Sequence, residues 1–169
     1  MTGPRLRWIA PAAALILAGA LSGCGFTPLY GQPGVTGGMS SVEVHAPHGR
    51  AAFLLAQDLE DALARDKSSP PAYRLDIQVN ESRYSRGLQS NGVATRFESH
   101  LTVSYSLVAL SSHKVVKTGV EPVEVSYANS DQPYAGITAQ QNAQERAASV
   151  AADRIRLDLA TYFAAHSAR

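Results

Sequence analysis

The sequence predicts a single α+β domain, a two-layer sandwich in which two helices cover one face of a four-stranded, mostly antiparallel sheet. Several strand-like segments alternate apolar and polar residues, so each needs only one covered face. Two other segments have the apolar period of a helix, and the chain has the length of one ordinary domain. The expected order is strand, helix, three strands and helix (β-α-β-β-β-α), within residues 41–169.

The first strand is expected at residues 41–46, where Val42 and Val44 alternate with polar residues. Residues 49–66 then have a helical period. Their apolar side chains recur on one face: Ala52, Leu55, Ala56, Leu59, Ala62 and Leu63. Two prolines at 70–71 end this helix, because proline disfavours helical geometry in the residue before it.

Three strands come next in the chain. In the first of them, apolar residues alternate with polar ones: Leu75, Ile77 and Val79. Residues 81–92 lose this alternation and are expected to form a long hairpin connection or a bulged strand end. The alternation resumes over residues 97–107 and then over 115–127, where Pro122 indicates an edge strand or a bulge because proline cannot donate to a sheet ladder.

The last helix is expected to begin near Pro133, after the capping side chains of residues 129–131, and to run to about Ala165. Its apolar face has alanines first and bulkier side chains later: Ala148, Ala151, Ala152, Ile155, Leu159, Tyr162 and Phe163. Alanines allow a close approach of backbones, so this helix is expected to cover the sheet. The other face of the sheet then stays open and polar, and solvent is the simplest thing for it to meet.

The N-terminal segment predicts secretion and lipid attachment. Arg5 and Arg7 precede an apolar stretch that is shorter than the about 20 residues of a spanning helix, and residues 21–24 read Leu-Ser-Gly-Cys. This is the lipobox of a bacterial lipoprotein, in which residues 1–23 are removed and Cys24 takes a diacylglycerol and an N-linked acyl chain, such as palmitate. An ordinary cleavage after Ala18-Gly19-Ala20, which would release a soluble protein, is the alternative.

Residues 24–40 are dense in glycine and proline and are expected to be a tether. Gly25 rather than aspartate follows Cys24, and lipoprotein sorting rules then favour the outer membrane. The 15 basic and 14 acidic residues nearly balance, which argues against nucleic-acid binding. No catalytic or nucleotide-binding motif is present, and the five histidines have no metal-ligand spacing, so the sequence predicts neither an enzyme nor a metal cofactor.

Three features together resemble one family: the opening Cys24-Gly25-Phe26-Thr27-Pro28-Leu29-Tyr30-Gly31, the order of elements, and the helix segment 151–159. The chain resembles the lipopolysaccharide (LPS) assembly lipoprotein family LptE. The resemblance implies a non-enzymatic, lipid-anchored protein on the periplasmic side of the outer membrane. It would plug the β-barrel of LptD and help to pass LPS to the cell surface.

The resemblance also implies which residues meet these partners. A water-filled barrel lumen suits the polar sheet face, whose expected members are Arg74, Asp76, Gln78, Arg96, Glu98, His100 and Thr102. Cations can pair with LPS phosphates, and the candidates are Arg83, Arg86, Arg96, Lys114 and Lys117, with the lysines near the arginines if the hairpins stack. The alternatives are a stand-alone periplasmic lipoprotein adaptor, an accessory subunit of another envelope transporter and, more remotely, a periplasmic hydrolase.

Overall fold

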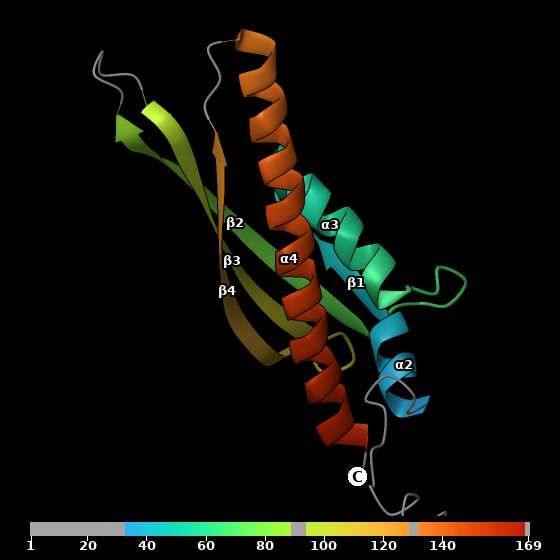
Figure 1. The fold of residues 1–169 in the computed structure, drawn as a ribbon. Helices are drawn as coiled ribbons and strands as arrows, with labels where there is room; N and C mark the ends of the chain where they lie inside the picture. Colours follow the sequence, from blue (N-terminus) through green and yellow to red (C-terminus); the bar gives the residue numbers. More distant parts are fainter. Residues whose placement is uncertain (1–32, 89–93, 129–131, 168–169) are drawn as a thin grey trace, which may run out of the picture.

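A computed structural model describes residues 33–88, 94–128 and 132–167, which form one sheet and three helices (Figure 1). The elements in chain order are α2 (Pro33–Ser40), β1 (Val42–His45), α3 (Arg50–Leu63), β2 (Tyr73–Leu88), β3 (Ala94–Ala109), β4 (Lys114–Ala128) and α4 (Pro133–Ser167). The strand order is β1-β2-β3-β4; β1 pairs in parallel with β2, and the other two pairs are antiparallel. The predicted α+β fold with a mostly antiparallel, four-stranded sheet is confirmed.

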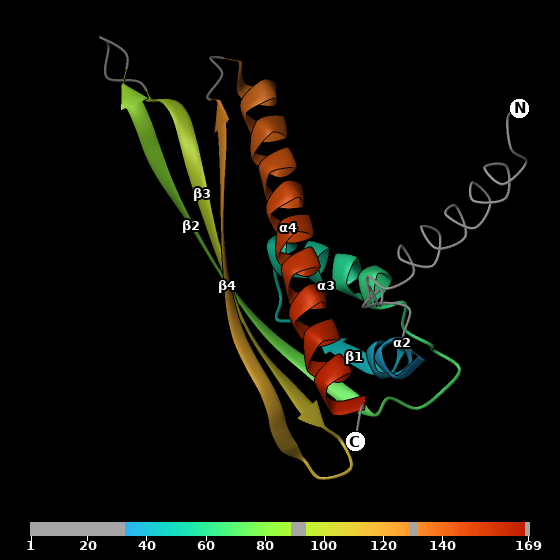
Figure 2. The same cartoon turned by 60° about the horizontal axis from the view of Figure 1, so that its bottom comes forward.

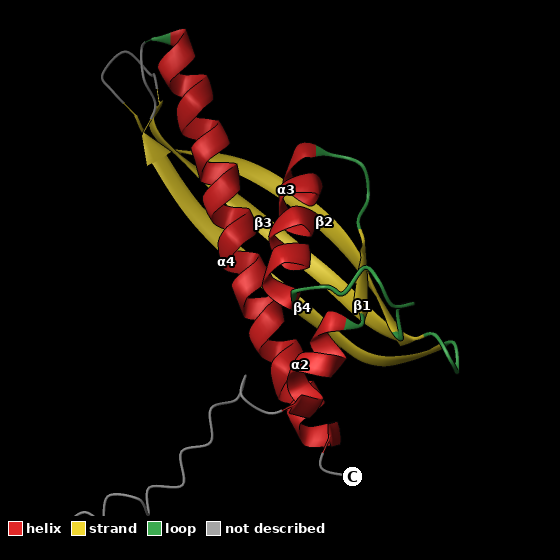
Figure 3. Ribbon diagram, turned by 90° about the vertical axis from the view of Figure 1, so that its right-hand side faces the viewer, coloured by secondary structure: helices red, strands yellow, loops and turns green. Residues whose placement is uncertain are grey.

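All three helices lie on one side of the sheet, and the other side is left open (Figure 2). The helix α4 runs across the sheet with α3 beside it and α2 near its C-terminal end (Figure 3). The core fills the space between the layers with fully buried leucine, isoleucine and valine side chains: Leu55, Leu59, Leu75, Leu101, Val103, Leu107, Ile155 and Leu159. Burial of each such side chain contributes about 1.5–3 kcal/mol to folding, so this layer supplies most of the driving force.

The helix α4 approaches the sheet as its sequence predicts. Alanines fill the buried face in its middle, and Ala148, Ala151 and Ala152 are at most 2% exposed. The bulkier Ile155, Leu159 and Phe163 are buried further along. Small side chains let the helix lie close to the sheet at one point, and larger ones fill the wider gap beyond it.

Residues 33–40, which the sequence assigns to the tether, form the helix α2 instead. Val35 and Met39 are buried in the core, and the ring of Phe163 packs where a Cβ of Gly38 would be. Glycine and proline disfavour a helix when it is isolated, so local propensity favoured the tether. Packing against α4 stabilises the helix instead. The rest of the predicted signal peptide and tether, including Cys24, lies outside the described residues.

The strands β2 and β3 are longer than the sequence indicates. Residues 81–88, expected within a hairpin connection, continue β2 in regular register with β3. On the helix side, Gln144 Nε2 donates to Glu81 Oε2 at 2.9 Å, and Arg83 Nη1 donates to Gln140 Oε1 at 3.3 Å. The strand therefore keeps its regular backbone pairing with β3 where its side chains make polar contacts with α4. The alternation of apolar and polar residues is lost there, so it does not indicate this part of the strand.

Candidate functional site on the open face of the sheet

The helices leave one face of the sheet uncovered (Figure 2). Leu75 and Ile77 point to the helices, so the even-numbered residues of β2 point away from them, and the register gives the same for β3. The open face therefore carries the residues that the sequence expects on it: Arg74, Asp76, Gln78, Arg96, Glu98, His100 and Thr102.

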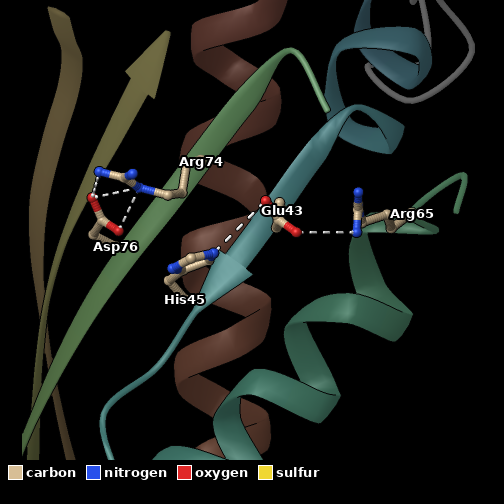
Figure 4. A network of polar contacts seen from close by, with 5 residues as sticks. All are labelled: Glu43, His45, Arg65, Arg74 and Asp76. Carbon is tan, nitrogen blue, oxygen red and sulfur yellow. Dashed lines mark hydrogen bonds and ion pairs between the residues drawn. The ribbon is translucent and has the colours of Figure 1, made fainter. Parts of the chain in front are cut away.

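One group of charges on this face lies near the short strand β1 (Figure 4). Arg74 Nε and Asp76 Oδ1, both from β2, are 2.8 Å apart. On β1, the carboxylate of Glu43 lies 3.7 Å from His45 Nε2 and 3.8 Å from Arg65 Nη1, which comes from the segment after α3. These cations and anions compensate one another within the chain.

A second group lies toward the other end of the face. Arg86 Nε is 2.7 Å from Glu98 Oε2, and His100 lies between Glu98 and Glu124, at 3.6 and 3.3 Å. The hydrogen bond from Arg86 lowers the pKa of Glu98 and raises that of Arg86 itself. The Tyr84 ring meets the His100 ring edge-on, with centroids 4.9 Å apart. With Arg96, which lies opposite Arg86, this group has two arginines and two glutamates, so its formal charge is also balanced.

The middle of the face carries no charge and is slightly hollow. A depression of about 510 Å³ is lined by the uncharged polar side chains of Gln78, Asn80, Thr102 and Ser104. These side chains are exposed and have no hydrogen-bond partner within the described residues. The side chains of this face that are free to make further hydrogen bonds therefore lie mainly between the two charged groups.

The structure separates the five cations that the sequence treats as one cluster. Arg83 faces the helices, with its guanidinium 4.8 Å from the centre of the Phe97 ring. Arg86 and Arg96 are direct cross-strand neighbours on the opposite face. Arg83 and Arg86 thus lie on different sides of the sheet, since three positions along a strand reverse the side-chain direction.

The two lysines lie far from the arginines. Arg96 pairs with Ala128 at one end of β3, and Lys114 pairs with Ala109 at the other, so the two ends are roughly 40 Å apart along the strand. Lys117 faces the helices and lies 2.9 Å from Asp158 of α4. The expectation that the lysines lie near the arginines is wrong, because a long regular hairpin holds its two ends apart.

The structure contains a polar cluster between the layers that the sequence did not predict. The Tyr105 hydroxyl donates to Asp158, which also pairs with Lys117. Burial, and then the Asp158 carboxylate, raise the pKa of Tyr105. Three residues from β3, β4 and α4 make this cluster, so no local pattern could have indicated it.

A groove of about 660 Å³ runs between the end of β4 and the first half of α4. It is lined by Ser126, Tyr127, Ala128, Ala139, Asn142, Glu145 and Arg146. Tyr134 and Ile137, on the first turns of the same helix, are 86% and 55% exposed. In the described part of the chain, no three or more His, Cys, Asp or Glu side chains gather as a metal site would require. Nor is any described helix sufficiently long and apolar to span a membrane.

Comparison with known proteins gives one family and several structures. A family model described as LptE, lipopolysaccharide-assembly, matches residues 39–159. A candidate lipoprotein from Caulobacter crescentus CB15 is 47% identical, with 79% of this chain and 97% of that one covered, and a TM-score of 0.69. No curated protein matches the chain.

Two more distant structures share the fold alone. The rare lipoprotein B from Shewanella oneidensis is 12% identical, with 75% of this chain and 96% of that one covered, at a TM-score of 0.58. A minor lipoprotein from Acinetobacter baumannii is 14% identical, with coverages of 72% and 89% and a TM-score of 0.54.

Proposed function

The chain belongs to the LptE family of lipopolysaccharide-assembly proteins, and we propose from this that it is an outer-membrane lipoprotein that plugs the LptD β-barrel and assists the delivery of LPS to the cell surface. Acyl chains on Cys24 would hold it at the periplasmic side of the membrane. Its role would be structural, with no catalytic step.

The open face of the sheet is the observation that most supports this role. The lumen of a large membrane β-barrel has a polar wall. The face offers uncharged hydrogen-bonding side chains in its middle, and most of the charged side chains at either end already pair with one another. A polar wall can cover such a surface and leave few charges unpaired, and a buried unpaired charge is the costly event in desolvation.

Arginines near the distal end of the β2–β3 hairpin are the candidates for contact with LPS phosphates. Arg86 and Arg96 share the open face, and Arg83 lies on the helix side of the same strands. Charge reversal of Arg86 and Arg96 together should weaken LPS binding by the purified chain, and far-UV circular dichroism verifies that the variant folds. Lys114 provides a matched control at the far end of β4, and its reversal should leave binding unchanged. Equal losses in the two variants would contradict the assignment of the distal arginines.

Co-purification is the experiment that tests the proposal as a whole. The tagged, acylated chain, extracted in mild detergent, should bring down one large outer-membrane barrel identified by mass spectrometry. Its depletion should leave LPS short of the cell surface. Recovery of the chain without a barrel, together with normal surface LPS after depletion, would support the stand-alone adaptor instead.

The open face can be tested within the same assay. Replacing Thr102 and Ser104 by arginine adds two bulky charges to the middle of the face, where both side chains are exposed and unpaired. We expect loss of the barrel from the purified complex with an unchanged melting temperature. The same two-charge addition at Phe53 and Gln57, which are both uncharged and exposed on α3, is the control and should not affect the complex. Retention of the barrel by the first variant would show that this face is not the contact surface.

A further inference from the structure

The strand β4 is the free edge of the sheet, opposite the short strand β1. It is 15 residues long, and its outer side has no neighbouring strand among the described residues. The unpaired N–H and C=O groups of such an edge are a template for a strand from another chain.

Two arginines of α4 occupy carbonyl groups of this strand. Arg154 Nη1 donates to the carbonyl oxygen of Pro122 at 2.7 Å, and Arg146 Nη2 donates to that of Ser126 at 3.4 Å. In an antiparallel strand, residues two apart direct their backbone groups to the same side. Pro122 has no N–H, and proline in a sheet is placed where that missing donor faces outward. The outward-pointing positions are therefore Thr118, Val120, Pro122, Glu124 and Ser126.

We propose that α4 closes this edge, and that removal of the two arginines converts β4 into a pairing surface for β4 of a second copy of this chain. In the wild-type chain, the outer edge of β4 between Pro122 and Ser126 lacks a backbone N–H at Pro122. The carbonyl oxygens of Pro122 and Ser126 already accept hydrogen bonds from the two arginines. The proposal is independent of the proposed function. It concerns how the chain avoids pairing with itself.

The charges of β4 favour pairing with β4 of a second copy of the chain. Lys117 and Glu121 lie at equal distances from Gly119, and both face the helix side, opposite Leu107 and Val103. An antiparallel copy of β4, related by a twofold axis at Gly119, would set Lys117, which also lies 2.9 Å from Asp158 of its own chain, opposite Glu121 twice, and opposite charges stabilise such cross-strand pairs. In this register the outward backbone groups of Thr118 meet those of Val120, which gives the two hydrogen bonds nearest the axis. Pro122 then lies opposite Val116 of the second copy, so Arg154 holds a carbonyl within the paired segment, and Arg146 holds one just beyond the end of that segment.

The test compares the wild-type chain with the double variant Arg146→Met/Arg154→Met. Methionine retains an apolar stem of similar length and removes the guanidinium donors. Sedimentation velocity of the full chain in detergent micelles, over a range of protein concentrations, should show a monomer for the wild type. The double variant should form a dimer whose dissociation constant is lower by about tenfold or more, which corresponds to about 1.4 kcal/mol. Arg50→Met is the control, because the Arg50 guanidinium pairs with the Glu145 carboxylate of α4, at 3.0 Å, rather than with a carbonyl group of β4.

A third substitution tests whether any association uses the edge. Val120→Pro removes an N–H that points outward, so it costs the monomer no ladder hydrogen bond, yet it removes a donor near the twofold axis. Added to the double variant, it should restore the monomer. A double variant that stays monomeric, or a dimer that survives Val120→Pro, would overturn the proposal. Far-UV circular dichroism verifies the fold, and Arg154→Met alone is judged by the same criteria if the double variant unfolds.

Discussion

Replacing Gly119 by alanine should destabilise the folded chain, because Gly119 of β4 lies directly opposite Tyr105 of β3. A Cβ at this position would lie 2.6 Å from Cε1 of Tyr105 and closer still to its Cζ and Oη. Carbon atoms that are not bonded to each other are stable at about 3.5–4.0 Å. The tyrosine ring therefore has to move, and its hydroxyl then loses the hydrogen bond to Asp158.

The expected cost is the sum of two terms. Overpacking costs about 1–3 kcal/mol, and a hydrogen bond to a charged group contributes roughly 1.5–3 kcal/mol. Asp158 is 33% exposed and keeps Lys117 at 2.9 Å, so the lower end of the second range applies. The total is about 2.5–4.5 kcal/mol, which lowers the melting temperature of a chain of this size by roughly 5–18 °C.

Thermal and urea unfolding, followed by far-UV circular dichroism, measure this loss. Gly37→Ala is the matched control, because Gly37 lies in α2 and nothing lies within 4 Å of a Cβ added there. Alanine in place of a helical glycine should stabilise by about 0.5–1 kcal/mol. A Gly119→Ala variant within about 0.5 kcal/mol of the wild type would show that Tyr105 has room to move, and the reasoning would fail.

Three further predictions concern other groups. Burial and Asp158 raise the pKa of Tyr105, so its contribution to stability is present below the unfolded pKa near about 10 and is lost as the pH rises through the folded value. The alkaline loss of stability should thus be smaller in Tyr105→Phe, and equal losses would contradict this cause. Arg86 lowers the pKa of Glu98, which stabilises the fold above the unfolded pKa of the carboxyl group and ceases to do so as the pH falls. In Arg86→Ala, the pKa of Glu98 measured by NMR should rise, and an unchanged value would exclude the pair as its cause. Leu159 is 0% exposed, so Leu159→Ala should cost about 2–5 kcal/mol in urea unfolding, and a loss below about 1 kcal/mol would mean that the core collapses into the space.

Much of the fold could be predicted because the elements have local periods. The alternation at Leu75, Ile77 and Val79 marks a strand, and the spacing of leucines in residues 50–63 marks a helix. Two elements could not be predicted from the sequence, because contacts with residues distant in the chain stabilise them. The helix α2 depends on Phe163 and α4, and the second half of β2 depends on polar contacts with the same helix.

The candidate site could be predicted only in outline. Alternation placed Asp76, Gln78 and Thr102 on one face, because a strand reverses side-chain direction at each residue. It could not show that His100 lies between Glu98 and Glu124, since Glu124 comes from a different strand. It also could not show that the arginine and lysine candidates lie at opposite ends of a long hairpin.

The sequence by itself determined the type and order of most elements, the polarity of each strand face, and the motif around Cys24 that indicates a lipid anchor, because each of these depends on neighbours within a few residues. The tertiary structure decided which charges compensate each other, where Arg83 points, and that Arg146 and Arg154 reach the edge of β4. These depend on strand register and on the path of α4 across the sheet. Register and path are set by the packing of the whole core, which no single segment encodes.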